Sequence, residues 1–124
     1  MTRDSASRGH QALQDACSLT LLADCIPLFE VLKDPCRQKL FVRLVVAGEL
    51  SVNELAEGSA LSRTAVSHHL KLLEQHGLVS VRKVGTRRIL RPRADEVLGQ
   101  LRHLVDALQN DLDAARACQE RVEP

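Results

Sequence analysis

The chain has 124 residues, of which 44% are hydrophobic and 27% are charged, and its formal net charge is +1. This composition is typical of a globular protein and excludes a largely disordered chain. The N-terminus lacks the apolar run of a secretory signal and no later window approaches the roughly 20 apolar residues that cross a bilayer, so we expect a cytoplasmic protein.

The first predicted helical segment is amphipathic and spans about Gln11 to Leu32. Pro27 lies inside it, and proline has no N–H for the helix ladder. We therefore expect Asp24 to cap a second helical piece that begins at Cys25. Residues 1–10 are expected to be disordered, because chain termini without an apolar pattern are poorly held.

Three helix-start signals follow in close succession. Each is a side chain that can accept backbone N–H bonds as an N-cap: Asp34, Ser51 and Ser62. Glu54 follows Ser51 by three residues and completes a capping-box pattern. Each predicted helix is followed by a glycine near its end: Gly48, Gly58 and Gly77. The last two helices, separated by a tight turn, form a predicted helix-turn-helix.

The segment after Gly77 alternates apolar and polar residues on both sides of Gly85, a pattern that predicts a β-hairpin. We expect its apolar side to cover the core with Leu78, Val81, Ile89 and Leu90. Beyond Pro92, a long helix is predicted from Ala94 to about Gln119. Its broad apolar stripe exceeds what a small core can cover, so we expect a second copy of the chain to bury it.

The predicted helix from Ser62 to His76 has two different faces. One face carries Val66, Leu70 and Leu73 and is expected to pack. The other face suits base edges and phosphates in a major groove, and it comprises Arg63, Thr64, Ser67, His68 and Lys71. We assign His69 a packing role and His76 a role at the helix end.

Positive charge is concentrated around this helix and the hairpin. Between Leu61 and Arg93, eight Lys and Arg side chains stand against one carboxylate, that of Glu74. Such a segment is the electrostatic footprint expected where duplex phosphates approach. We assign the hairpin cations to phosphate or minor-groove contacts, with a solvated face as the alternative: Arg82, Lys83, Arg87 and Arg88.

Three motifs lie between Phe29 and Leu90, and they read DPCR, ELSVNELA and LSRTAVSHHLKLLEQHGLV. In this stretch the chain resembles the ArsR/SmtB family of winged helix-turn-helix repressors. The resemblance implies a mainly α fold with a small β-hairpin wing, and a homodimer formed by the first and last helices. It also implies binding to an inverted-repeat DNA operator and release by a metal, a metalloid or a thiol-directed signal. On this basis residues 11–124 are expected to form a single DNA-binding and dimerisation domain.

The sequence departs from the sensing patterns that the resemblance brings with it. Arsenic and cadmium sensors of the family carry cysteines where this chain has Ser51 and Asn53. The final helix holds one histidine, His103, and alanines stand where zinc and nickel sensors have later ligands, at Ala114 and Ala117. Neither type of metal site is therefore expected.

The cysteines are the remaining candidates for sensing a signal: Cys17, Cys25, Cys36 and Cys118. Cys25 and Cys36 each follow an aspartate at a predicted helix start, where the helix dipole favours a thiolate. One hypothesis is that Cys17 or Cys25 of one chain acts with Cys118 of another to sense a metalloid, a metal or an oxidant. The alternative is that all four are small buried side chains. The fold requires no cofactor on either interpretation.

A winged helix that contacts only proteins, or a regulator without a small-molecule inducer, is the alternative that the sequence leaves open. An enzyme is not expected, because the chain has no phosphate-binding glycine loop, no HExxH or GxSxG motif and no convincing acid–base pair.

Overall fold

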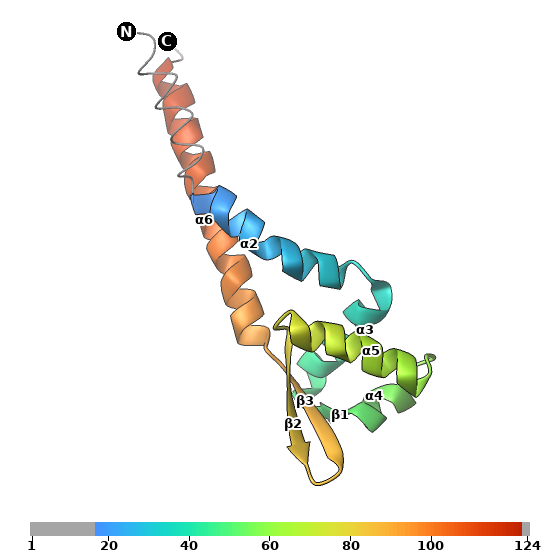
Figure 1. Ribbon diagram of the computed structural model, residues 1–124. Coiled ribbons are helices and arrows are strands. Elements are labelled where there is room, and N and C mark those ends of the chain that lie inside the picture. Colours follow the sequence, from blue (N-terminus) through green and yellow to red (C-terminus); the bar gives the residue numbers. More distant parts are fainter. Residues whose placement is uncertain (1–16, 123–124) are drawn as a thin grey trace. The chain divides into compact units, whose positions relative to one another are not determined.

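The computed structural model describes residues 17–122. The helices are α2 (Cys17–Leu32), α3 (Pro35–Ala47), α4 (Val52–Glu57), α5 (Arg63–Gln75) and α6 (Ala94–Val122) (Figure 1). The strands are β1 (Leu50–Ser51), β2 (Val79–Val84) and β3 (Arg87–Pro92). The mainly helical fold with a small hairpin agrees with the predicted fold class. The disorder predicted for residues 1–10 lies outside the described residues.

Backbone contacts divide the chain into two compact units. One unit is Pro27–Leu98, and it holds α3, α4, α5 and the sheet. The other unit comprises Met1–Ile26 and Gly99–Pro124, and its described part holds the first portion of α2 and most of α6. The single domain expected over residues 11–124 stays a prediction.

The three predicted N-caps are confirmed. The Asp34 carboxylate accepts hydrogen bonds from the backbone N–H groups of Cys36 and Arg37, at 2.8 and 3.2 Å. Ser51 and Glu54 form a complete capping box before α4, and the Ser62 hydroxyl accepts from the Ala65 N–H at 3.2 Å. These side chains satisfy donors that have no partner inside their helices, so local sequence sets where α3, α4 and α5 begin.

The expected break in the first helical segment was wrong. α2 is one helix that continues through Pro27, and Asp24 lies within it and starts no second piece. A proline inside a helix costs about 3 kcal/mol because it removes one ladder bond and crowds the preceding turn. Leu28 and Val31 of α2 are both buried, and burial of such side chains at about 1.5–3 kcal/mol each offsets that cost.

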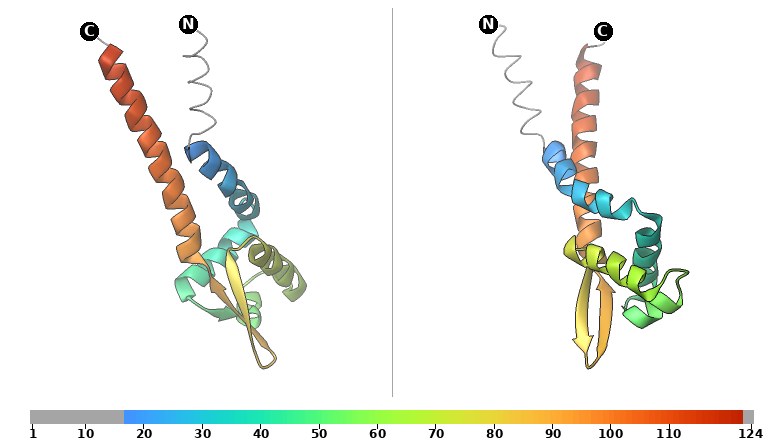
Figure 2. Two further views of the ribbon diagram at one scale, coloured as in Figure 1. Left: turned by 60° about the vertical axis from the view of Figure 1, so that its left-hand side comes forward. Right: turned by 45° about the vertical axis from the view of Figure 1, so that its right-hand side comes forward.

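The sheet has three antiparallel strands in the order β1-β3-β2. β2 and β3 form the predicted hairpin, which Figure 2 shows from two directions. The sequence did not predict β1, a strand of two residues that pairs Leu50 with Leu90. We call the β2–β3 hairpin the wing.

Val81 is not part of the core, contrary to expectation. Val79 is 2% exposed, whereas Val81 is 39% exposed. Alternate residues of a strand share a face, so both side chains lie on the same side of β2. Val81 lies two residues nearer the hairpin tip, where the strand is less completely covered.

The core of unit Pro27–Leu98 is aliphatic. The packing face predicted for α5 is confirmed, since Val66, Leu70 and Leu73 are all buried. They share the interior with side chains from the other elements of the unit, including Leu40, Leu44, Leu55, Leu78, Val79 and Leu90. This core fixes α5 against α3 and leaves its opposite side in solvent.

The other unit joins α2 to α6 with few polar contacts. Ser18 donates a hydrogen bond to the Asp111 carboxylate, and the Gln100 amide donates to the backbone oxygen of Asp24 at 2.9 Å. Large apolar side chains of both helices remain exposed here: Leu19, Leu22, Ile26, Val105, Leu108 and Leu112. No helix in the described part of the chain is both long and apolar enough to span a membrane.

Candidate nucleic-acid interface

The outer face of α5 presents the predicted reading residues to solvent. All five are exposed: Arg63, Thr64, Ser67, His68 and Lys71. The face follows from the helix period, because the buried residues of α5 lie on its opposite side. Short side chains lie at its N-terminal end, which is the end that enters a major groove in helix-turn-helix proteins.

The wing brings further cations into the same unit. Arg82, Lys83, Arg87 and Arg88 are all exposed on β2 and β3. Register pairs Lys83 with Arg88 and Val84 with Arg87, next to the turn at Gly85. Gly85 has a φ of 63°, a left-handed conformation that glycine adopts without a steric penalty. The sequence predicted this clustering of charge at the hairpin tip.

Two of the wing arginines are paired with carboxylates, which the sequence did not predict. Arg82 donates to Glu49 at 2.6 Å, and Arg87 lies 3.4 Å from Glu54. Both pairs are exposed, so each is worth well under about 1 kcal/mol. Lys83 and Arg88 form no ion pair within residues 17–122. The positive charge available to a ligand is therefore uneven along the wing.

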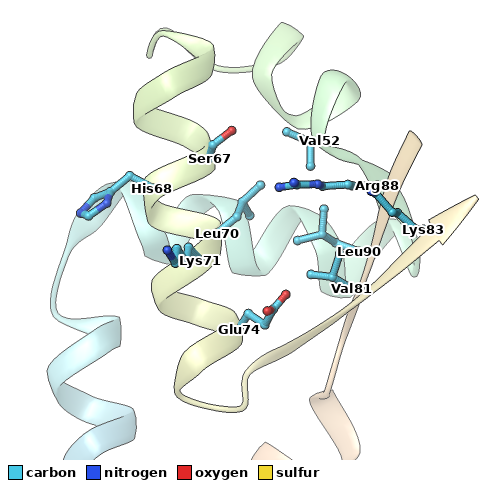
Figure 3. Close-up of a pocket in the computed structure, with 10 residues that line it drawn as sticks. All are labelled: Val52, Ser67, His68, Leu70, Lys71, Glu74, Val81, Lys83, Arg88 and Leu90. Atoms are coloured by element: carbon cyan, nitrogen blue, oxygen red, sulfur yellow. The ribbon is translucent and has the colours of Figure 1, made fainter. Parts of the chain in front are cut away.

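A groove of about 710 Å³ lies between α5 and the wing (Figure 3). Ser67 and Glu74 line it from α5, and Val81 and Arg88 line it from the strands. The lining combines cationic side chains such as Lys71 with apolar ones such as Leu70. Glu74 is the one carboxylate in the lining, and it would repel an approaching phosphate.

A smaller hollow of about 210 Å³ lies where α4, α5 and the wing meet, and Arg63, Thr86 and Arg87 line it. Here Arg63 donates a hydrogen bond to the Asn53 side chain. The sequence did not indicate Asn53 or Thr86 as part of the interface, because its charge pattern points to α5 and the wing cations alone. The donors of the hollow suit a phosphate oxygen.

The three histidines of the helix-turn-helix have different environments. His68 is exposed, whereas His69 is half-buried and its Nδ1 lies 3.4 Å from the Arg37 guanidinium. Arginine can only donate, so Nδ1 of His69 is the acceptor in this contact. His76 donates from Nδ1 to the Leu72 oxygen at 2.9 Å, which confirms its predicted role at the helix end.

The described cysteine side chains differ in their exposure. Cys25 is completely buried within α2, and Cys118 is exposed near the end of α6. The expected position of Cys25 at a helix start was wrong, because α2 begins at Cys17. The Cys17 side chain lies outside the described residues. Cys36 is half-buried in the first turn of α3, as predicted.

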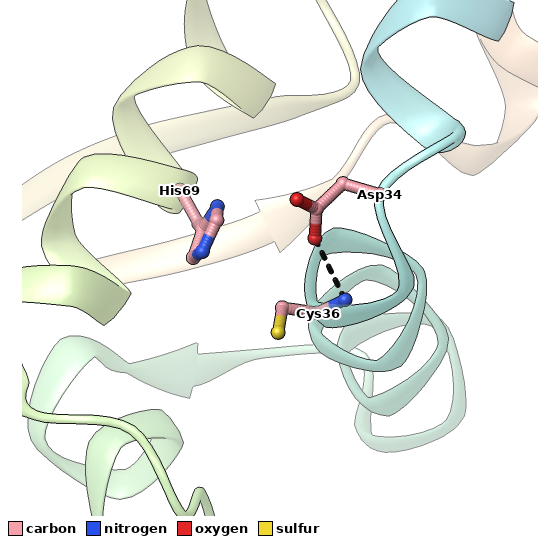
Figure 4. A group of neighbouring side chains, drawn as sticks. All are labelled: Asp34, Cys36 and His69. Atoms are coloured by element: carbon pink, nitrogen blue, oxygen red, sulfur yellow. Dashed lines mark hydrogen bonds between the residues drawn. The ribbon is translucent and has the colours of Figure 1, made fainter.

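The sequence did not predict one group of potential metal ligands that the structure brings together. The side chains of Asp34, Cys36 and His69 approach one another, and their ligand atoms all lie within 4.8 Å (Figure 4). Hydrogen bonds from the Arg37 and Cys36 N–H groups lower the pKa of the Asp34 carboxyl, against a smaller opposing effect of burial. Asp34 is therefore a carboxylate at neutral pH.

Comparisons with known proteins agree with this architecture. A family model described as "Helix-turn-helix domain" matches residues 32–82. A transcriptional repressor SmtB homolog from Synechocystis sp. is 35% identical over 100 residues, which are 80% of this chain and 74% of the relative.

Two solved structures share the fold. An ArsR-like transcriptional regulator from Rhodococcus sp. RHA1 has a TM-score of 0.69 and 27% identity, and the match covers 82% of this chain and 93% of that one. The homodimeric winged helix-turn-helix DNA-binding domain from Mycobacterium bovis has a TM-score of 0.57 and 27% identity, and the match covers 75% and 84%. The chain thus belongs to the ArsR/SmtB family of winged helix DNA-binding transcriptional regulators.

Proposed function

We propose that the chain acts in the cytoplasm as a homodimeric repressor that binds an inverted-repeat operator through α5 and the wing. The observation that carries this proposal is the exposed face of α5 beside the cations of the wing, all within one compact unit. Arg63 suits guanine O6 and N7, Ser67 and Thr64 suit phosphates or base edges, and His68 can donate or accept. Lys71 and the wing cations bind the phosphate backbone of the flanking DNA.

The geometry of duplex DNA and the exposed apolar side chains of α2 and α6 support the proposed dimer. Two recognition helices read an inverted repeat when they enter successive major grooves about 34 Å apart. The exposed leucines and valines of α2 and α6 give a second copy an apolar surface to bury. The Mycobacterium bovis structure named above is described as homodimeric, and the Synechocystis relative is described as a repressor.

Selection of binding sites from a random duplex pool, followed by fluorescence anisotropy, tests this function. We expect one inverted repeat to be enriched and its affinity to fall steeply with salt, because each neutralised phosphate contributes about 0.9 to the logarithmic slope. Arg63→Ala and His68→Ala are expected to relax base preference, at about 1–3 kcal/mol for a lost bidentate contact. A module that contacts only proteins would enrich no sequence and show little salt dependence.

We further propose that a thiol-directed signal releases the operator. Cys36 and Cys118 are the accessible cysteines among the described side chains, while burial argues against direct reaction at Cys25. Serine replacements of Cys17, Cys25, Cys36 and Cys118, one at a time, identify the sensor when operator release is measured with arsenite, antimonite, zinc and persulfide. An unchanged response in every variant would remove the thiol from the mechanism.

A further inference from the structure

The geometry points to a binding site for a divalent transition-metal ion of the zinc class at Asp34, Cys36 and His69. The three ligand atoms lie within 4.8 Å of one another. In a tetrahedral zinc site, bond lengths of about 2.0–2.3 Å place neighbouring ligand atoms about 3.3–3.7 Å apart. Small side-chain rotations therefore bring the three donors to bonding distance, with a fourth position left for water.

Each side chain has a donor atom to offer. Asp34 Oδ1 caps α3 by accepting hydrogen bonds from the N–H groups of Cys36 and Arg37. The other carboxylate oxygen takes no part in this cap. The cap holds the carboxylate in place, as hydrogen bonds commonly do for metal-binding carboxylates. Cys36 is a free thiol, and Figure 4 shows it on the side of α3 that faces the His69 ring.

Arg37 competes with a metal ion for His69, but the hydrogen bond between the two side chains is weak. Its Nη1 lies 3.4 Å from His69 Nδ1, whereas its Nε donates to the Val31 oxygen at 2.7 Å. The longer bond is much the weaker of the two. A metal ion can therefore displace the first contact while Arg37 keeps the second. The charges of a carboxylate and a thiolate also neutralise a dication beside the guanidinium.

The donor set selects the class of ion. One thiolate, one imidazole and one carboxylate suit borderline ions such as Zn²⁺ and Co²⁺. Arsenite and other soft species prefer several thiolates, and the cluster holds one. Ca²⁺ and Mg²⁺ prefer oxygen ligands alone. The site also differs from the arsenic and cadmium pattern, which would need cysteines at Ser51 and Asn53. It differs equally from the zinc and nickel pattern, which would need ligands at Ala114 and Ala117 of α6.

The ion would join the start of α3 to the recognition helix. Asp34 and Cys36 belong to the α3 N-terminus, and His69 belongs to α5, next to the reading residue His68. A ligand held by both helices restricts how α5 can adjust in a groove, so operator affinity is linked to metal occupancy. This regulatory part rests on the function proposed above, whereas metal binding itself does not.

Titration of the metal-free full-length protein with Co²⁺ tests the site without DNA. We expect one ion per chain, thiolate-to-cobalt charge-transfer absorption, and displacement by Zn²⁺. Cys36→Ser and His69→Gln are each expected to weaken binding by at least about 100-fold, since even loss of an outer hydrogen-bond partner costs about 10–100-fold. Asp34→Asn keeps an N-cap and is expected to weaken metal binding without unfolding α3.

His103→Gln and Asp113→Asn are matched controls for the histidine and aspartate variants, because both residues are exposed on α6 and neither belongs to the cluster. Circular dichroism confirms that each variant is folded. The proposal is overturned if cobalt binds without the charge-transfer band, or if the controls weaken binding as much as Cys36→Ser does.

Operator affinity is then measured in EDTA and at saturating Zn²⁺. We expect a change of about 5–150-fold, the usual range of coupling between two sites, and its loss in Cys36→Ser. Equal affinities would overturn the regulatory role and leave the metal site standing. If no operator is found in EDTA or in zinc, the proposed function fails, while the cobalt titration still decides the site.

Discussion

At the scale of single residues, the wing carries less free charge than its composition suggests. Glu49 and Glu54 each lie 33 positions from the arginine that they pair with. Such pairs depend on how α4 and the strands meet, so no local pattern predicts them. The exposed cations themselves were predictable, because charge density and hairpin periodicity are both read along the chain.

Glu49→Gln is expected to tighten duplex binding by up to about fivefold. The change frees Arg82, and an exposed ion pair of this kind is worth about 0.2–1 kcal/mol. Glu57→Gln removes the same charge from a carboxylate that forms no ion pair within the described residues, and it serves as the control. Anisotropy at low salt measures both variants. Equal increases in duplex affinity for the two variants would mean that the Arg82–Glu49 ion pair has no effect on binding.

Arg88→Ala is expected to weaken binding to all duplexes more than Arg87→Ala does. Arg87 is ion-paired with Glu54 at 3.4 Å, whereas Arg88 lines the groove beside α5. A lost phosphate contact lowers the logarithmic salt slope by about 0.9 per chain. Binding of specific and unrelated duplexes across a salt series measures this difference. A larger loss in Arg87→Ala would contradict the inference.

At the scale of elements, capping residues allowed the starts of α3, α4 and α5 to be predicted. Each cap is a contact within three residues, which sequence alone can specify. The continuity of α2 through Pro27 and the two-residue strand β1 were not predictable in the same way. Both depend on burial or pairing with distant segments, such as Leu50 with Leu90.

The capping box of α4 predicts a dependence of stability on pH. Hydrogen bonds from Ser51, backbone first, lower the pKa of Glu54 from its ordinary value of 4.5. The folded pKa lies below the unfolded one, so this stabilisation is present at neutral pH and is lost as pH falls through the folded pKa. The urea midpoint is therefore expected to fall on acidification below about pH 5.

Glu54→Gln should reduce this fall, because glutamine keeps the capping box and does not titrate. Urea unfolding followed by circular dichroism at neutral and acidic pH measures the difference. Asp34 acts in the same direction, since its pKa is also lowered, and it preserves part of the fall in the variant. An unchanged pH dependence in Glu54→Gln would assign the acid sensitivity to other carboxylates.

At the scale of the whole molecule, family membership confirms the expectation that the chain is a DNA-binding regulator and not an enzyme. The motifs between Phe29 and Leu90 allowed this prediction. The sequence indicated Cys36 as a candidate sensor but not that Asp34 and His69 lie beside it. That juxtaposition arises from the packing of α3 against α5, which joins segments more than 30 residues apart.

Leu108→Lys is expected to break the proposed homodimer. Leu108 is 48% exposed in the single chain, and a lysine there would place charge in an apolar interface. Gln109→Lys adds the same charge at a neighbouring exposed polar position and serves as the control. Sedimentation velocity measures the oligomeric state, and loss of operator binding is expected to follow in Leu108→Lys alone. A dimer that survives this change would place the interface elsewhere.

All three side chains of the Asp34, Cys36 and His69 cluster come from one chain and from one compact unit. Ion uptake there needs nothing from a second subunit, so diluting the protein should leave the midpoint of a cobalt titration where it was. The Leu108→Lys variant should bind cobalt with the same saturation curve as the parent protein. Each half of the assembly would in this way carry its own ion, loaded independently of the other.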